Sequence, residues 1–365
     1  MTQYENDHDG DATARRDALA ERLFQSVLQT LELGHVWLGD RLGLYAALAD
    51  LGDVTPAELA KATGIAERYA REWLEQQAVA AMVDVAVPNR NPAARRYRLP
   101  PGCAEVFLDP DSLRHRVPIA LQAVGVLRTL PQLKDAFRTG SGVPYADYGD
   151  DMGNIAGNRA KFTQQLATEW LPHLPDVHAR LTGGAALRVA DIGCGRGWSS
   201  IAIARAFPAV RVDAIDLDQA SIDEAERNAA AAGVADRVTF RCAGAATLAG
   251  SYDLICAFEC LHDMSDPVAA LRAARESLGP DGVLLVAEER LAEEFVAPGD
   301  DIERFQYAWS ALSCLPASLS EQPSAAIGSA IRPATVRSLA LSAGFTGVED
   351  LPIEHDLWLF YRFVP

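Results

Sequence analysis

From residue 187 onward, short apolar runs alternate with longer, alanine-rich segments in which apolar residues recur at helical spacing. The apolar runs have the length of buried strands and cover residues 187–192, 211–216, 237–242, 253–258 and 282–288. The segments with helical spacing cover residues 199–206, 219–232 and 267–278. This alternation predicts an α/β domain in which helices cover both faces of a parallel sheet.

The pattern changes at the end of the chain. A helix is predicted over residues 333–343, and two apolar runs follow at residues 348–353 and 357–363. The turn Glu354-His355-Asp356 joins these runs and is too short for a crossover, so the two strands are predicted to be antiparallel. We assign His355 and Asp356 to turn chemistry and not to catalysis.

The first third of the chain has a different pattern. Thr55-Pro56-Ala57-Glu58 has the form of a capping box with proline at the first helical position. A second helix and two short strands follow, which together predict a winged helix-turn-helix. We therefore expect a flexible N-terminus (1–17), a winged-helix domain (18–138), a linker with a connecting helix (139–175) and a second domain (176–365) that carries an insertion (297–332).

Composition narrows the choice of partners. A formal charge of −17 and a pI near 4.8 argue against nucleic acid or an anionic membrane, because both bind chiefly to basic surfaces. In the second helix of the winged motif, Arg68 and Arg71 are countered by three glutamates, but three further arginines in the following loop leave DNA binding open. The sequence shows neither a signal peptide pattern nor a long apolar run, so we expect a cytoplasmic protein.

Cysteine and histidine are scattered along the chain. None of the six cysteines forms a C-x-x-C pair, and the seven histidines are equally dispersed. We interpret the cysteines as free thiols in a reducing compartment, and we predict no metal site.

The turn from Asp191 to Gly197 carries glycine at every second position, between a predicted strand and a predicted helix. This construction brings a nucleotide-like ligand against bare backbone at a helix N-terminus. Trp198 occupies the place of the third glycine of a dinucleotide motif, and no P-loop ending is present. About twenty residues later, Asp216 ends the next strand, where a carboxylate can hold both hydroxyls of a ribose.

These motifs resemble those of class I S-adenosylmethionine-dependent methyltransferases. The resemblance rests on the glycine turn, on Asp216-Leu217-Asp218, on residues 253–263 and on the closing hairpin, and it covers about residues 175–365. The N-terminal part resembles the winged-helix dimerisation domain of small-molecule O-methyltransferases, and residues 40–45 and 353–356 are similar to a bacterial and mycobacterial branch. The resemblance implies a Rossmann-like seven-stranded sheet with one antiparallel strand, S-adenosyl-L-methionine as cofactor with S-adenosyl-L-homocysteine as product, a small-molecule acceptor and a homodimer formed through the N-terminal domain.

The same resemblance assigns roles to single residues around the cofactor. Many family members have Asp where Gly244 stands, so a backbone group or water must take over its contact with adenine. Aromatic residues of the linker could cover the cofactor or simply pack. The implied cofactor residues are Asp191 shaping the loop, Gly193, Gly195 and Gly197 along methionine and ribose, Asp216 on the ribose, Leu217, Gly244 and Ala245 at adenine, Phe258 and Glu259 on the sulfonium side, and Tyr145, Tyr148 and Phe162 as cover.

His262 follows the fourth predicted strand and resembles the general base of plant-type O-methyltransferases. An imidazole that titrates near neutral pH suits the removal of a hydroxyl proton. The alternative is that the stretch around His262 only caps a helix, with Asp266 as N-cap before Pro267. Glu288 and Glu289 end the next strand, where one of them could orient His262 or contact the acceptor, or form a structural ion pair.

The insertion 297–332 carries aromatic residues and is predicted to roof the substrate, with packing of a helix on the core as the alternative reason for the same aromatic spacing. Tyr307 and Trp309 of the insertion are predicted to contact the acceptor, together with Glu289. The apolar character of the insertion favours a hydrophobic or aromatic metabolite. Two alternatives remain open: N- or C-methylation that needs no histidine base, and a regulator that binds DNA and senses S-adenosylmethionine.

Overall fold

The computed structural model describes residues 4–149 and 158–365, and it divides the chain into two compact units, Met1–Val124 and Gly125–Pro365. Within the described ranges, no helix combines the length and the apolar character that crossing a bilayer requires.

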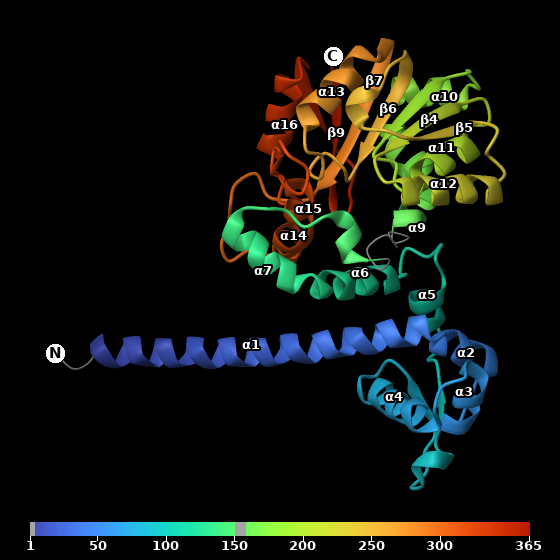
Figure 1. Ribbon diagram of the computed structural model, residues 1–365, viewed down its shortest axis with the longest axis vertical. Coiled ribbons are helices and arrows are strands. Elements are labelled where there is room, and N and C mark those ends of the chain that lie inside the picture. The colour runs from blue at the N-terminus through green and yellow to red at the C-terminus, as the bar shows by residue number, and fades with distance from the viewer. Residues whose placement is uncertain (1–3, 150–157) are drawn as a thin grey trace. The chain divides into compact units, whose positions relative to one another are not determined.

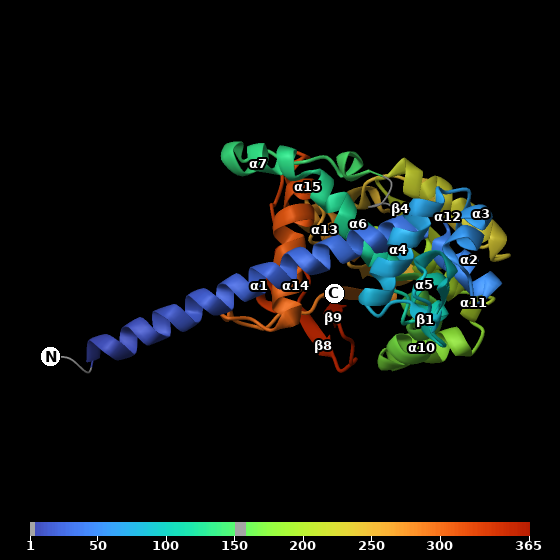
Figure 2. The same ribbon diagram turned by 90° about the horizontal axis from the view of Figure 1, so that it is seen from below.

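The first unit begins with a long helix, α1 (Tyr4–Arg41), which is unbroken in both views (Figure 1, Figure 2). Residues 1–3 lie outside the described residues, and the rest of the range that we expected to be a flexible N-terminus forms the first turns of α1. A left-handed Gly43 separates α1 from α2 (Leu44–Leu51), in which Leu44, Tyr45 and Leu48 are buried.

The winged helix-turn-helix is confirmed. In the capping box before α3 (Pro56–Thr63), Glu58 N–H donates to Thr55 Oγ1 and Thr55 N–H donates to the Glu58 carboxylate. Helix α4 (Glu67–Val79) follows, then η1 (Pro92–Ala94) within an antiparallel hairpin of β1 (Asp84–Val87) and β2 (Arg96–Arg98). The core beneath these elements is closed by Tyr45, Leu59, Trp73, Leu74 and Tyr97.

The arginines of the winged motif are largely engaged within their own unit. Arg68 pairs with Glu72 along α4, Arg95 pairs with Glu75, and Arg96 pairs with Glu58. These carboxylates offset part of the positive charge that contacts with phosphates would need.

The division between the units falls about fourteen residues earlier than the predicted domain end at residue 138. It lies within α6 (Val117–Arg128), which follows α5 (Cys103–Leu108), and α7 (Leu130–Thr139) therefore belongs to the second unit. The physical reason is packing: Leu133 and Ala136 on α7 form an apolar cluster with Trp309 and Leu312.

The second unit is built on the predicted seven-stranded sheet, and its strand order is β5-β4-β3-β6-β7-β9-β8 (Figure 1). Neighbouring strands are parallel except where β9 pairs with β7 and β8. The strands are β3 (Arg188–Ile192), β4 (Arg211–Asp216), β5 (Val238–Cys242), β6 (Tyr252–Phe258), β7 (Leu278–Glu289), β8 (Gly347–Leu351) and β9 (Trp358–Val364).

Helices cover both faces of this sheet (Figure 1). Alternate residues of β6 face opposite cores: Leu254 and Cys256 face one, and Ile255 and Ala257 the other. On the first face lie α9 (Arg159–Lys161), the π-helical η4 (Phe162–Trp170), η5 (Leu171–His173), α10 (Pro175–Thr182), α11 (Trp198–Ala206) and α12 (Gln219–Ala231). On the second face lie η6 (Ala245–Thr247), α13 (Pro267–Glu276) and α16 (Pro333–Ser342).

The insertion after β7 is helical. It consists of α14 (Asp301–Trp309), the π-helical η7 (Ser310–Cys314) and α15 (Leu315–Leu319), which follow one another without a break. The short helix η2 (Tyr145–Tyr148) packs against this insertion through Tyr148.

Candidate active site

The three glycines of the turn after β3 share a backbone conformation that favours glycine, but the space around them differs. All three residues have positive φ, at 69° for Gly193, 49° for Gly195 and 79° for Gly197. A Cβ on Gly193 would lie 2.7 Å from Cys260 Cβ, and a Cβ on Gly197 would lie 2.7 Å from the Phe240 ring. A Cβ on Gly195 would meet nothing within 4 Å, so the backbone there faces open space, as a close approach by a ligand requires.

Asp216 links this turn to the end of β4. Its two carboxylate oxygens accept hydrogen bonds from Gly195 N–H at 2.8 Å and from Asp218 N–H at 2.9 Å. Burial raises the pKa of Asp216, and these backbone hydrogen bonds oppose the rise. Each oxygen keeps a lone pair, so the carboxylate can still accept a ribose hydroxyl.

The residues beside Asp216 fit a purine. The Leu217 side chain is 60% exposed, and a Cβ on Gly244 would lie 3.6 Å from Leu217 Cδ2. Leu217 thus offers an exposed apolar side chain beside Gly244, next to Ala245 in η6. Asp218 accepts from Ser221 N–H and is the N-cap of α12, which leaves Asp216 free of that task. Asp216, Leu217 and Gly244 therefore fit an adenosine group.

Asp191 lies beneath the turn and is fully buried. Its Oδ2 accepts from Ser199 Oγ at 2.5 Å and from Ser200 Oγ at 2.6 Å, both in the first turn of α11. Burial raises the pKa of Asp191 to about 6, against the opposing effect of the two hydroxyls. Asp191 thus fixes the start of α11 from below, in agreement with a role in shaping the loop.

His262 lies at the same sheet edge, just after β6, and only 2% of it is exposed. Its Nδ1 lies 2.5 Å from Glu288 Oε2, and Leu261 N–H donates to Glu288 Oε1. The carboxylate of Glu288 therefore fixes the ring with Nδ1 as donor, and Nε2 faces Asp263 at 3.5 Å. Asp266 alone caps α13, by accepting from Ala269 N–H, so His262 has no part in the cap.

The charge on His262 follows from its neighbours. Burial alone would lower the pKa of His262, but the negative charges of Glu288 and Asp263 outweigh burial and raise the pKa well above its usual value. The neutral imidazole can take a proton from a substrate, and the carboxylate of Glu288 then stabilises the imidazolium that forms.

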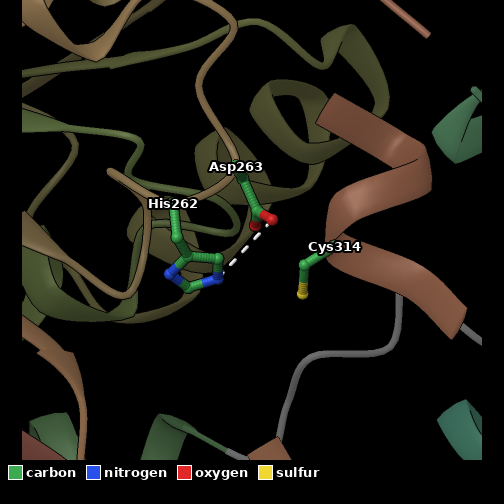
Figure 3. Close-up of side chains that lie close together, drawn as sticks. All are labelled: His262, Asp263 and Cys314. Carbon is green, nitrogen blue, oxygen red and sulfur yellow. Dashed lines mark ion pairs between the residues drawn. The ribbon is translucent and has the colours of Figure 1, made fainter. Parts of the chain in front are cut away.

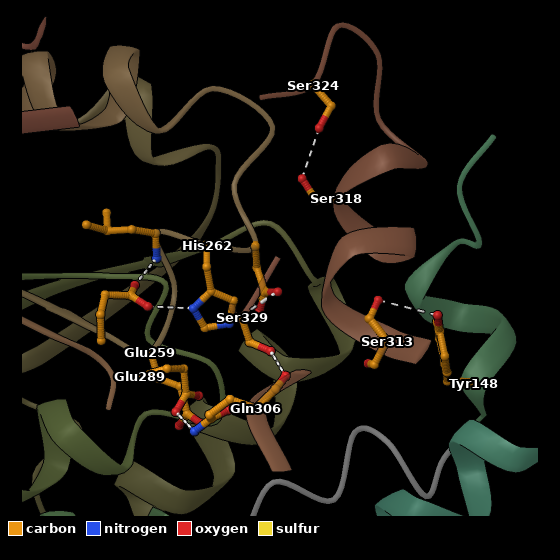
Figure 4. A network of polar contacts seen from close by, with 12 residues as sticks. Tyr148, Glu259, His262, Glu289, Gln306, Ser313, Ser318, Ser324 and Ser329 are labelled. Carbon is orange, nitrogen blue, oxygen red and sulfur yellow. Dashed lines mark hydrogen bonds and ion pairs between the residues drawn. The ribbon is translucent and has the colours of Figure 1, made fainter. Parts of the chain in front are cut away.

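A second acidic pair lies below His262 (Figure 4). Glu259 has a positive φ of 54°, a strained conformation that is concentrated at functional sites. Asn158 Nδ2 donates to Glu259 at 2.5 Å, and Gln306 Nε2 donates to Glu289. Burial and the negative charge of Glu259 raise the pKa of Glu289 well above its usual value.

Three of the predicted residues, Tyr148, Tyr307 and Trp309, have contacts within the insertion or against it. The Tyr148 hydroxyl donates to Leu312 O at 3.1 Å, and Figure 4 shows it directed at η7. Tyr307 is 38% exposed and its hydroxyl accepts from Arg332, while Trp309 packs on the α7 cluster. All three residues thus have packing or hydrogen-bond contacts within the protein.

Two further aromatic residues can be placed. Phe258 packs in an aromatic cluster with Phe162 and Trp170, beneath the sheet edge. Partial burial, and then the negative charges of Asp263 and Asp218, raise the pKa of Tyr145. Tyr145, and not Tyr148, is therefore the residue of η2 within electrostatic reach of the glycine turn.

The sequence interpretation missed Gln306, Asn158 and Cys314. Gln306 comes from the same helix as Tyr307 and Trp309, and its 1% exposure distinguishes it from them. No local pattern marks these three residues, because each reaches the site only through the packing of a distant segment. His355, by contrast, is confirmed as a turn residue: its Nδ1 accepts from Leu357 N–H and Trp358 N–H, and burial lowers its pKa to about 4.

Comparison with known proteins agrees with both units. Residues 189–282 match the family described as methyltransferase domain, and residues 29–108 match the family described as Rv2258c-like winged HTH domain. The 27-O-demethylrifamycin SV methyltransferase of Amycolatopsis mediterranei is 35% identical over 120 residues, which are 32% of this chain and 44% of that protein. The ubiquinone biosynthesis O-methyltransferase of Neisseria meningitidis is 34% identical over 113 residues, which are 30% and 45%. The chain therefore spans less than half the length of these curated relatives.

Solved structures show the same fold along nearly the whole chain. Mitomycin 7-O-methyltransferase aligns with a TM-score of 0.71 and 19% identity, over 97% of this chain and all of that one. Human N-acetylserotonin methyltransferase, in complex with its cofactor, aligns with a TM-score of 0.66 and 17% identity, over 94% and 97%. At such identities the likeness establishes the fold.

Proposed function

We propose that this chain, which carries a methyltransferase domain together with an Rv2258c-like winged helix-turn-helix domain, transfers a methyl group from S-adenosylmethionine to a hydroxyl group of a small metabolite. The observation that carries the proposal is the His262–Glu288 pair, which lies at the same sheet edge as the glycine turn and Asp216. A cofactor cradle and a proton acceptor at one edge meet the two requirements of O-methylation.

Different residues of the glycine turn and of the end of β4 would contact different parts of the cofactor. Gly193, Gly195 and Gly197 would border methionine and ribose, Asp216 would accept from the ribose hydroxyls, and Leu217 would pack on adenine. When bound, the sulfonium of the cofactor supplies an activated methyl group, so the protein has mainly to align the acceptor and exclude water.

His262 then acts on the acceptor as general base. Glu288 holds Nδ1–H, which leaves the Nε2 lone pair to take the hydroxyl proton as the oxygen attacks. Glu288 also stabilises the imidazolium that forms. The neutral form of His262 is the active one, and it becomes more abundant as the pH rises. Because Glu288 raises the pKa of His262, this change takes place at higher pH than for an ordinary histidine.

The acceptor class follows from two lines of support. Relatives named for the methylation of rifamycin, mitomycin and ubiquinone precursors favour a small-molecule hydroxyl, and we propose an apolar or aromatic acceptor. Glu289, which accepts a hydrogen bond from Gln306 and whose pKa is raised by burial and by Glu259, offers a hydrogen-bonding group to that acceptor.

We also propose that the chain forms a homodimer through α1. Between residues 19 and 31 of this helix, six large apolar side chains are at least 40% exposed and recur at helical spacing, and such a stripe requires a partner. These residues are Leu19, Leu23, Phe24, Val27, Leu28 and Leu31. The six cysteines are unpaired thiols, which is consistent with action in the cytoplasm.

The experiment that tests the function combines calorimetry with a methyl-transfer screen of phenolic and other hydroxylated metabolites. We expect the chain to bind S-adenosylmethionine, and His262→Gln to bind it equally well while turnover of a hydroxyl acceptor falls by about 10²–10⁴-fold. Unchanged turnover in His262→Gln would contradict the base role and indicate N- or C-methylation. A chain that binds no cofactor would contradict the function itself.

A further inference from the structure

His262, Asp263 and Cys314 form a cluster of three different metal-ligating side chains beside the proposed base. His262 Nε2, a carboxylate oxygen of Asp263 and Cys314 Sγ all lie within 4.8 Å of one another. Figure 3 shows the three side chains directed into one space, two from the segment after β6 and one from the end of η7. We propose that this cluster binds a zinc ion, and that zinc bound there inhibits methyl transfer.

The ligand types and distances suit zinc. One imidazole nitrogen, one thiolate and one carboxylate oxygen are the donors that Zn²⁺ takes, at bond lengths of about 2.0–2.3 Å. In a tetrahedral site such bonds place neighbouring ligand atoms roughly 3.3–3.7 Å apart. The separation of 3.5 Å between His262 Nε2 and Asp263 Oδ1 already fits this range.

The histidine ligand already has a carboxylate that supports it. A histidine that ligates a metal usually donates its other ring N–H to a carboxylate, which fixes the tautomer and makes the ligand more basic. Glu288 does this for His262 at 2.5 Å, and Glu288 is itself held by Leu261 N–H. The lone pair of Nε2 is thereby directed towards Asp263 and Cys314.

The cluster is accessible and can adjust. The Asp263 side chain is 49% exposed, so an ion can enter from solvent on that side. Cys314 lies in π-helical η7 and is only half-buried, and a shift of its thiol would complete the site. With three protein ligands, the fourth position stays open to water, as in zinc sites that are not purely structural.

The inference of inhibition rests on the proposed function, because it depends on His262 as base. Zn²⁺ takes the Nε2 lone pair, one Asp263 oxygen and the Cys314 thiolate, and the protons of the imidazolium and the thiol pass to solvent. A lone pair bound to zinc cannot accept the proton of a hydroxyl, so the zinc-loaded chain lacks its base.

Metal binding is tested on the full chain without any acceptor. The metal-free protein is titrated with Zn²⁺ against a competing chelator, and with Co²⁺ under absorption spectroscopy. We expect one ion per chain and a charge-transfer band of a cobalt–thiolate bond. Cys314→Ser should abolish the band and weaken zinc binding about tenfold or more. Asp263→Asn should weaken zinc binding by a similar factor. Cys103→Ser, in the other unit, is the matched control and should bind as the unmodified chain does.

Two results would overturn the site: the absence of the cobalt–thiolate band, or equal zinc affinity in Cys314→Ser and the unmodified chain. Asp263→Asn changes an exposed side chain, so it gives an answer even where Cys314→Ser folds poorly. Inhibition is then measured as the ratio of turnover with and without zinc within each variant. A chain that turns over equally fast with zinc bound would overturn the inhibition, and cofactor binding measured by calorimetry keeps this result separate from a failure of the proposed function.

Discussion

Glu288 holds His262 and the backbone beside it with different oxygens of one carboxylate. Oε2 lies 2.5 Å from His262 Nδ1, and Oε1 accepts from Leu261 N–H at 2.7 Å. This arrangement fixes both the orientation of the imidazole ring and the position of the segment that carries it. It also explains why the pKa of a histidine with so little exposure is raised and not lowered.

Glu288→Gln should therefore change the pH dependence of turnover. Without the carboxylate charge, the pKa of His262 falls, so the rising limb of the profile of kcat against pH should move to lower pH. We expect kcat at its plateau to fall by about 10–100-fold, because the imidazolium loses its partner. The affinity for S-adenosylmethionine should not change. Glu293→Gln, an exposed glutamate paired with Arg337, is the control, and a limb that stays in place in Glu288→Gln would contradict the pairing.

Asp216→Ala should weaken the binding of S-adenosylmethionine about 10–100-fold, since it removes charge-assisted hydrogen bonds to the ribose and leaves Gly195 N–H without its acceptor. Asp218→Ala is a matched control two residues away. It removes the N-cap of α12 and should lower the free energy of unfolding by about 1 kcal/mol while cofactor affinity stays the same. Calorimetry and urea unfolding separate the two effects, and equal cofactor affinity in all three proteins would argue against the ribose contact.

Gly195→Ala and Gly197→Ala should fail in different ways. The methyl group on residue 197 would collide with Phe240, so we expect the free energy of unfolding to fall by about 2–4 kcal/mol. The methyl group on residue 195 points into open space and costs only about 1 kcal/mol of backbone strain, but it should lower cofactor affinity about tenfold or more. Normal cofactor binding by Gly195→Ala would show that the ligand does not approach this backbone.

Asp191 should make the folded chain less stable as the pH rises from about 4 to 6. Its pKa is about 6 in the folded chain against an ordinary value of 3.8, so the folded state holds more protons than the unfolded state in this window. The free energy of unfolding should fall by about 3 kcal/mol across the window on account of this group. Asp191→Asn lacks the titration. Urea unfolding at several pH values should show a difference between the two proteins that grows with pH, and parallel curves would contradict the buried ionisation.

Replacing apolar residues of α1 should separate the proposed dimer. Leu23→Glu together with Leu31→Glu places two charges on the exposed stripe, and light scattering should then report a monomer that still folds, because neither side chain is buried in the single chain. Gln25→Glu, at a polar position on the same helix, is the control and should leave the dimer intact. A native chain that is already monomeric would refute the proposal.

The parts of the fold that were predictable are those that a local pattern encodes. Strand β4 was predicted with its observed bounds, since an apolar run ends at Asp216 before a polar turn. The capping box at Thr55 was equally local. Gln306 and Cys314 could not be assigned to the site, because the side that a helix presents depends on what packs against it. The π-helical turns of η7 also shift which residues face inwards, and no spacing rule for regular helices anticipates this.

The packing of α7 on the insertion has a consequence for exchanging parts between related proteins. Side chains of α7 and the Tyr148 hydroxyl contact the insertion, and residues 125–149 belong to the second unit. This segment should therefore be exchanged together with the second unit. A chimera that joined a foreign N-terminal domain at residue 139 would combine an α7 from one parent with an insertion from the other, and would leave that apolar cluster mismatched. A junction near residue 124 would take the hydrophobic core of each unit from one parent protein only.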